Sequence, residues 1–293
     1  MQAFLDVFDI YLLEAVINGI LLGGVLALLA LGLNLIFGVI DVTWICYAEL
    51  VMIGMYGMYF MVQYYGVSYF VAAPFTILLV AALGAALHYL VIAPLLTAPP
   101  INQLLATGGV LFVLQSFATV AFGIDFRNLG IRLPVLVFGD MNFSYARLLS
   151  FLAALVGMVA VYLFMTRTFT GTAIRAISQD RQIMALMGVD TRRIYLITSA
   201  LGGALAGLAA CLLVLQYDVH PFVGLSFGPI TFLICVLGGL GNFIGGFIAA
   251  FVFAEIISLG GLFSDLEWGY VLAFAFFIVM MFIRPAGLFA RRS

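Results

Sequence analysis

Charge is what this sequence has least of. Only 8% of its 293 residues are charged, whereas about 25% are charged in a typical soluble domain, so too few polar side chains are present to cover a soluble core of this size. Lysine is absent, since all 11 basic residues are arginine, and the formal net charge is −2. This composition provides no basic surface for nucleic acid. Cys46, Cys211 and Cys235 lie in or beside apolar runs without metal-ligand spacing, so neither a disulfide set nor a cysteine metal site is expected.

Catalytic motifs are also missing. The sequence has only two histidines, His88 and His220, from which no convincing Ser-His-Asp or Cys-His set can be assembled. It contains no HExxH motif, no Walker A loop and no clustered metal ligands. We therefore expect a protein that is not an enzyme, has no ATPase site of its own and binds no cofactor or metal ion. For His88, which lies in an apolar run, packing or hydrogen bonding is favoured over a proton relay.

Long apolar runs dominate instead. Hydrophobic residues make up 66% of the chain, and apolar runs of about 20 residues, the length of a helix that crosses a bilayer, recur along it. The sequence thus predicts an all-α, polytopic membrane protein with a single transmembrane domain, 1–293, and no linker or soluble domain. The expected apolar spans are 12–38, 47–65, 69–96, 102–123, 144–166, 195–216, 228–259 and 268–284.

The placement of arginine predicts the orientation of the spans, because cytoplasmic loops of membrane proteins carry an excess of basic residues. Five arginines lie in the polar segment 167–194, and two more lie in the C-terminal tail. This segment and the C-terminus are therefore expected in the cytoplasm, with the N-terminus outside. The stretches 1–9, 217–227 and 260–267 carry acids but no arginine, so they are expected on the outer side.

The run 228–259 does not fit a single helix. The two cytoplasmic regions must be separated by an even number of crossings, and the spans 195–216 and 268–284 already supply two. A continuous helix over 228–259 would also be about 48 Å long, well beyond a hydrocarbon core of about 30 Å. The run GGLGNFIGG at 238–246 predicts a break, hence two short helices or a re-entrant hairpin and about eight or nine membrane segments. The expected hinge glycines are Gly238, Gly239, Gly241 and Gly245.

Small residues recur four positions apart in three of the spans, which places them on one face of a helix. Close packing of helices within the subunit is favoured over a substrate path as their role. The residues concerned are Gly19, Gly23 and Ala27; Ser199, Gly203, Gly207 and Cys211; and Gly241, Gly245 and Ala249.

The polar stretch GTAIRAISQDRQIMALMGVDTRR, 171–193, interrupts the apolar pattern. Ile174, Ile177 and Leu186 alternate with polar residues at a helical spacing, and Gly188 is a typical residue to end such a helix. The periodicity predicts one amphipathic helix. It leaves open whether this helix lies on the membrane surface or docks in a groove of a partner protein.

The residues of this stretch resemble a known family. The pattern G-x-A-I-R-A at 171–176, followed by Gln179, Asp180, Gly188 and Val189, is similar to the coupling segment of ABC-importer permeases of the branched-chain amino acid (LIV) type. Further motifs resemble the same family, in the right order and over nearly the whole chain. They are LALLALGLNLIFGVI, SALGGALAGLAACLL, CVLGGLGNFIGGFIAA and RPAGLF.

This resemblance implies a permease subunit of an importer in the inner membrane of the cell. Its partners would be a second homologous permease subunit, two cytoplasmic ATP-binding subunits that use ATP, and an extracytoplasmic solute-binding protein. The ATP-binding subunits would hold the coupling segment 167–194 and drive alternating access. The coupling residues implied are Arg175, Gln179, Asp180 and Arg181, with Ile183, Met184, Met187 and Gly188 at or beside a buried knob.

One element departs from the family. Where the family usually carries N-F-A-H-G and an acid, this chain has WICYAE from Trp44 to Glu49, and only the acid is retained. The change is compatible with a structural turn that has drifted, or with an altered substrate path that offers aromatic stacking surfaces. The candidate path residues are Trp44, Tyr47, Glu49, Asn34 and Glu255.

The cargo stays open at this level. Branched-chain or other hydrophobic amino acids are the default by resemblance, and an aromatic acid, an amide or urea are the alternatives. A different class is a self-sufficient, ion-coupled secondary carrier that would use His88 and the buried acids. This class is disfavoured, because the acids are scattered rather than paired along a pathway.

Overall fold

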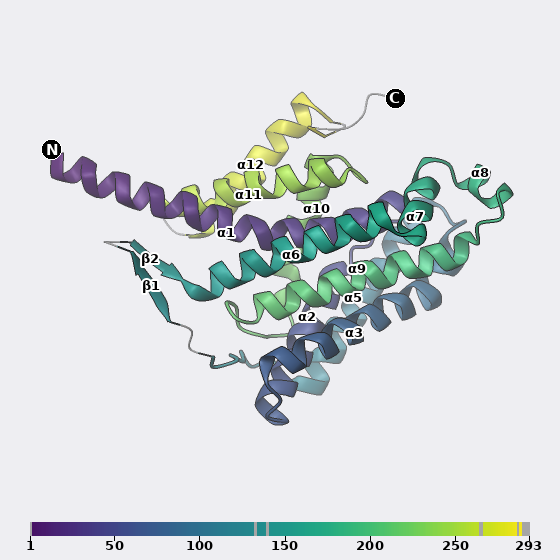
Figure 1. Cartoon of the computed structure of the whole chain (residues 1–293), viewed down its shortest axis with the longest axis horizontal. Helices are drawn as coiled ribbons and strands as arrows, with labels where there is room; N and C mark the ends of the chain where they lie inside the picture. The colour runs from purple at the N-terminus through teal and green to yellow at the C-terminus, as the bar shows by residue number, and fades with distance from the viewer. Residues whose placement is uncertain (1, 132–133, 139–140, 264–265, 286, 289–293) are drawn as a thin grey trace.

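Helices account for most of the structure, and the long helices α1, α6 and α9 run roughly along one direction, whereas α12 is inclined to them (Figure 1). The computed structural model describes residues 2–131, 134–138, 141–263, 266–285 and 287–288. The helices are α1 Gln2–Ile40, α2 Tyr47–Tyr59, α3 Tyr69–Leu87, α4 Ala93–Leu95, α5 Pro100–Phe122, α6 Tyr145–Arg167, α7 Phe169–Gln179, α8 Arg181–Leu186, α9 Thr191–Leu213, α10 Val223–Gly238, α11 Phe243–Phe263 and α12 Leu266–Ile283. π-helical turns at Phe60–Tyr64 and His88–Ile92 extend α2 and join α3 to α4.

Several of these helices have the dimensions of membrane spans, which agrees with the prediction of a helical membrane protein. Within the described part of the chain, six are long and apolar enough to cross a bilayer, and α10 and α12 are shorter apolar helices. The six are Tyr11–Ile40, Tyr69–Leu95, Pro100–Phe122, Tyr145–Arg167, Thr191–Leu213 and Phe243–Leu262. The total of eight or nine crossings stays a prediction.

The break in the glycine-rich run is present, as predicted. Helix α10 ends at Gly238 and α11 begins at Phe243, so two helices replace the single apolar run. Gly239 and Gly241 have φ angles of 93° and 78°, in the region that residues with a Cβ rarely adopt. The N–H of the partly buried Gly241 donates to Oδ1 of the buried Asn34 on α1, 3.2 Å away.

Small residues bring pairs of helices into close contact, as their spacing predicts. A Cβ on Gly203 would lie 2.6 Å from the backbone oxygen of Val80, which shows how closely α9 approaches α3. A Cβ on Gly23 would meet the ring of Phe251 at 2.8 Å, where α1 packs along α11. The first contact packs backbone against backbone and the second packs a ring against a glycine, and such close packing at small residues is the usual way in which helices associate in membranes.

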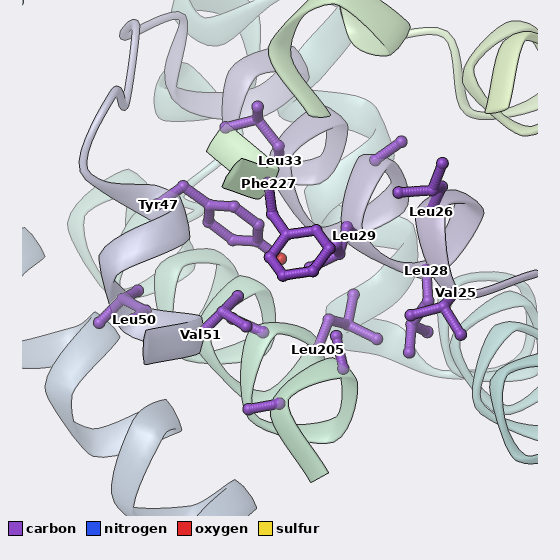
Figure 2. Packing of buried hydrophobic residues seen from close by; sticks show 14 of the residues in the cluster. Val25, Leu26, Leu28, Leu29, Leu33, Tyr47, Leu50, Val51, Leu205 and Phe227 are labelled. Carbon is purple, nitrogen blue, oxygen red and sulfur yellow. The ribbon is translucent and has the colours of Figure 1, made fainter. Parts of the chain in front are cut away.

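The buried core surrounds α1, against which α6, α9, α10 and α11 all pack. Figure 2 shows Tyr47 of α2 pointing into the same cluster as Leu29 and Leu33 of α1 and Phe227 of α10. The Tyr47 hydroxyl donates to the backbone oxygen of Gly202 on α9 at 3.3 Å. The start of α2 is thus held between α1, α9 and α10.

A β-hairpin that the sequence reading did not predict precedes α6. Strand β1 (Val135–Phe138) pairs antiparallel with β2 (Met141–Ser144), from Val135 opposite Ser144 to Phe138 opposite Met141. The chain sequence VLVF is rich in β-branched and aromatic residues, and Gly-Asp follows it, a typical two-residue hairpin signal. The sequence reading assigned no element to 124–143, between the expected spans 102–123 and 144–166.

The closeness of the two glycine segments makes a testable prediction. In Gly245→Ala the new Cβ would overlap the backbone oxygen of Gly238, so α10 and α11 would have to separate. We expect a loss of stability of about 1–3 kcal/mol and an apparent melting temperature lower by several degrees in detergent. Gly108→Ala, where a Cβ would meet nothing within 4 Å, is the matched control and should melt like the wild type. Equal melting of both variants would contradict the packing described.

Candidate coupling segment and translocation cavity

The polar segment forms two helices, not the single amphipathic helix predicted. Helix α7 begins after Thr168, whose Oγ1 accepts from the Gly171 N–H at 3.0 Å. Its apolar residues Ile174 and Ile177 are fully buried, in contacts of α7 with α1, α6 and α9. The apolar face of α7 is therefore covered by the chain itself and is not available to a partner.

Asp180 produces the break between the two helices. Its backbone is extended, with φ −153° and ψ 109°, and its Oδ1 accepts from the N–H groups of Gln182 and Ile183, both at 2.9 Å. This is the geometry of an N-cap, in which a side-chain oxygen binds the free N–H groups of a first turn. Asp180 thus ends α7 and starts α8, a role that the helical period concealed.

Helix α8 projects from one end of the molecule, far from the N-terminus (Figure 1). Its apolar side chains face outward: Ile183 is 57% exposed, Leu186 87% and Met187 75%, while Met184 is partly buried. Gly188, with φ 81°, ends this turn. Arg175 and Gln179 are exposed on the adjacent surface of α7. The predicted coupling residues therefore share one end of the molecule, and those of α8 carry an uncovered apolar surface.

Arg181 links α8 to the end of α1. Its guanidinium lies 3.4 Å from Oδ2 of Asp41, the residue that follows α1 and has a φ of 61°. The two side chains are 43% and 66% exposed, so the pair contributes at most about 1 kcal/mol. The pair matters because it connects α8 to α2: the segment from Asp41 to Cys46 leads directly from this contact into α2.

Trp44, Tyr47 and Glu49, three of the predicted path residues, line one cavity of about 260 Å³. The walls come from the segment before α2, from α1, α5 and α10, and are mostly apolar. The remaining lining residues are Leu33, Thr43, Ile45, Ala48, Leu104, Leu111, Gly224, Leu225, Gly228, Pro229, Thr231 and Phe232.

Glu49 is the single acidic or basic residue among the described residues that line this cavity. It is fully buried, and its Oε1 accepts a hydrogen bond from Nε2 of Gln115 on α5 at 3.1 Å. Its Oε2 has no hydrogen-bond partner among the described atoms. Sequence reasoning missed Gln115, because nothing in a single sequence indicates that residues so far apart meet.

The other two predicted path residues lie elsewhere. Asn34 binds Gly241 at the break between α10 and α11. Glu255 lies on α11, where its carboxylate faces Gly19 of α1, and a Cβ at Gly19 would be 2.7 Å from Glu255 Oε2. Neither residue lines the cavity around Glu49.

Comparison of the sequence with models of known families agrees with a membrane-embedded helical protein. The sequence model of the branched-chain amino acid transport system, permease component, matches residues 15–281. The chain belongs to this family. The permease is 26% identical to the high-affinity branched-chain amino acid transport system permease protein LivH of Escherichia coli K12, over 96% of both chains. It is 27% identical to BraD of Pseudomonas aeruginosa, named in the same way, over 95% of this chain and 96% of the relative.

Two further likenesses extend the comparison. The permease is 26% identical to LivM of Escherichia coli K12, a high-affinity branched-chain amino acid transport system permease protein, over 89% of this chain and 67% of LivM. Its fold resembles a chain in the structure of PsaBC from Streptococcus pneumoniae in complex with Fab, with a TM-score of 0.53, 13% identity and coverage of 93% and 92% of the two chains. This last likeness concerns the fold alone.

A second cavity of the permease, of about 430 Å³, lies on another face of α10. Leu225 and Pro229 line both cavities, so this edge of α10 separates them. Asp218 and His220 line the second cavity, and Asp218 Oδ1 accepts from Nδ2 of Asn128 at 2.7 Å. Burial lowers the pKa of His220, and the nearby Asp218 carboxylate counters part of this effect. The net lowering of the pKa favours a neutral imidazole at neutral pH.

The capping role of Asp180 is open to test. Asp180→Ala removes the acceptor for two N–H groups, which costs about 1 kcal/mol. We expect faster hydrogen exchange at the amides of Gln182 and Ile183, measured in the purified permease, with unchanged exchange in α7. Asp180→Asn keeps a capping oxygen and serves as the control. Equal exchange in the alanine variant and the wild type would refute the cap.

Proposed function

We propose that this chain is the transmembrane permease subunit of an ABC importer and moves small hydrophobic amino acids or related organic solutes across the inner membrane. The observation that carries the proposal is the family match over residues 15–281. The chain itself would bind no ATP. Separate ATPase subunits would supply the energy.

The proposed cargo follows the relatives. LivH and BraD are both named as parts of high-affinity branched-chain amino acid transport systems. Branched-chain amino acids are therefore the first candidate, and amides, urea and aromatic acids are the others. Titrating the cognate solute-binding protein with leucine, urea, a short amide and an aromatic acid would choose between them.

The proposed assembly has two permease subunits, two cytoplasmic ATPase subunits and an extracytoplasmic solute-binding protein. A homologous second permease is supported by the similarity of this chain to LivH and also to LivM. Contact with the ATPase subunits is supported by α8, because its exposed Ile183, Leu186 and Met187 form an apolar surface outside the long helices. Such a surface fits a hydrophobic groove on a partner.

The proposed mechanism is alternating access. Closure of the ATPase dimer would move α8, and α7 would transmit the motion because its buried face is packed against α1, α6 and α9. The contact of Arg181 with Asp41 gives a second connection. It ends in the segment that carries Trp44 and leads to Glu49. Movement of this segment would open or close the cavity.

The proposed orientation places the N-terminus outside, with segment 167–194 and the C-terminus in the cytoplasm and about nine crossings between the termini. The argument is the distribution of arginine. Arg291 and Arg292 of the tail lie outside the described residues, and Arg167, Arg175 and Arg181 lie at the end of α6 and in α7 and α8.

An ion-coupled secondary carrier is the alternative from another class. His88, which such a carrier would use, is buried, and its Nδ1 lies 3.0 Å from Ser199 Oγ where the π-helical turn after α3 packs against α9. In proteoliposomes holding the whole assembly and binding protein, we expect uptake to require ATP and to be unaffected by collapsing proton and sodium gradients. Uptake by this chain alone, driven by an ion gradient, would reverse the proposal.

The exposed apolar residues of α8 should determine assembly. Ile183→Asp places a charge in the proposed contact, and we expect copurification with the ATPase subunits to weaken by about 2 kcal/mol or more, roughly thirtyfold in affinity. Ile124→Asp is the matched control, since Ile124 is also exposed (67%) but lies between α5 and β1. Comparable copurification of both variants would rule out α8 as the contact.

A further inference from the structure

The cavity around Glu49 combines an apolar wall with one buried carboxylate. Trp44, Leu104, Leu111 and Phe232 are among the apolar residues that line it. The volume of about 260 Å³ is below the roughly 300–1,000 Å³ of pockets for drug-sized ligands, so it suits a small metabolite. An apolar pocket with few polar groups recognises a ligand by its shape and by the group that pairs with those polar atoms.

The hydrogen bonds of Glu49 are incomplete. Gln115 satisfies Oε1, while Oε2 is buried without a partner. A buried acceptor left unpaired costs about 1–3 kcal/mol, and more when it is charged. Among the described residues, no basic side chain lines the cavity to pair with it. The carboxylate is therefore a free acceptor at the edge of an apolar space.

Two helix starts surround this carboxylate. Glu49 lies in the first turn of α2, and Gly224 lies in the first turn of α10. A Cβ on Gly224 would be 2.6 Å from Oε1 and 2.7 Å from Oε2, so only glycine lets α10 approach both oxygens. The partial positive charge at helix N-termini stabilises an anion, as does the Gln115 amide. These groups offset part of the cost of burying this carboxyl group, and an N–H donor is the matching partner for its free oxygen.

We infer that Glu49 recognises an N–H-bearing group of the cargo, an ammonium or an amide, while the apolar part of the cargo lies against Trp44, Leu111 and Phe232. This inference rests on the proposed function and narrows its cargo. An acid without an N–H group is disfavoured, because its carboxylate would face that of Glu49. Glu49 is fully buried here, so it meets cargo when the segment before α2 moves.

Three probes with the same apolar body isolate the polar group: isopentylamine, isovaleramide and isovalerate. Their binding is measured by thermal-shift titration of the permease–ATPase complex in nanodiscs, without the solute-binding protein, so that its selectivity does not enter. We expect the amine or the amide to bind the wild type at least tenfold more tightly than the acid. The amine and amide arms show which donor is preferred. Binding of the acid as tight as both others, or binding of neither the amine nor the amide, would overturn the inference.

Two variants then separate recognition from structure. Glu49→Gln keeps the size of the side chain and removes its charge. If the amine is the preferred probe, its affinity should fall at least tenfold; if the amide is preferred, its affinity should fall threefold. Glu49→Asp keeps the charge and should retain affinity better than Glu49→Gln. A purely structural Glu49 would give the opposite order, because the shorter side chain would disturb packing more. Glu267→Gln, at an exposed acid that starts α12, is the control and should bind as the wild type does.

The two proposals fail in different ways. Suppose that the wild type copurifies with its ATPase and that Glu49→Gln binds the probes as tightly as the wild type does. The role of Glu49 is then overturned, while the importer proposal stands. A wild type that does not associate with any ATPase subunit counts against the importer itself. If Glu49→Gln does not fold, Glu49→Asp still decides, since loss of amine and amide binding in a folded aspartate variant contradicts recognition by charge.

Discussion

The hydrogen bond from the Gly241 N–H to Asn34 is the interaction on which the arrangement of α1, α10 and α11 depends. In an apolar environment every backbone polar group needs an internal partner, so a helix can be interrupted only where protein supplies one. Asn34 is fully buried in α1, the helix around which the core is organised. The same helix therefore packs against its neighbours and supplies the hydrogen-bond acceptor for the Gly241 N–H at the break, after which α11 packs along α1.

The polar segment divides two tasks between two short helices. Helix α7 buries Ile174 and Ile177 against the membrane helices, which fixes its position relative to them. Helix α8 leaves Ile183 and Leu186 uncovered. A rigid attachment and an uncovered contact surface are both required of an element that receives force from outside and passes it on. The single extended residue Asp180 makes this division possible by ending one helix and capping the next.

The first turns of α2 and α10 meet at the cavity, and the flanks of α1 and α5 complete its wall. Helix α2 follows a non-helical segment from Asp41 to Cys46, and α10 follows the loop after α9. Their first turns meet at Glu49 and Gly224. Discontinuous helices of this kind provide oriented dipoles and movable backbone inside a membrane protein, which continuous helices do not. The cavity lies beside the segment that Arg181 of α8 contacts through Asp41, so in the proposed mechanism a motion of α8 would reach a buried carboxylate.

The features that the sequence determined by itself are those set by interactions between residues close together in the chain. Apolar length predicted the helices and the glycines predicted the break at 239–242, because both act within a few residues. The period across 171–193 predicted helix but not the cap at Asp180, since a local hydrogen bond competes with propensity there. Only the tertiary structure decided that Glu49, rather than Glu255, lines the cavity and that Gln115 reaches it. A helical period shows which residues share a face, whereas the neighbour that covers the face is chosen by packing of the whole chain.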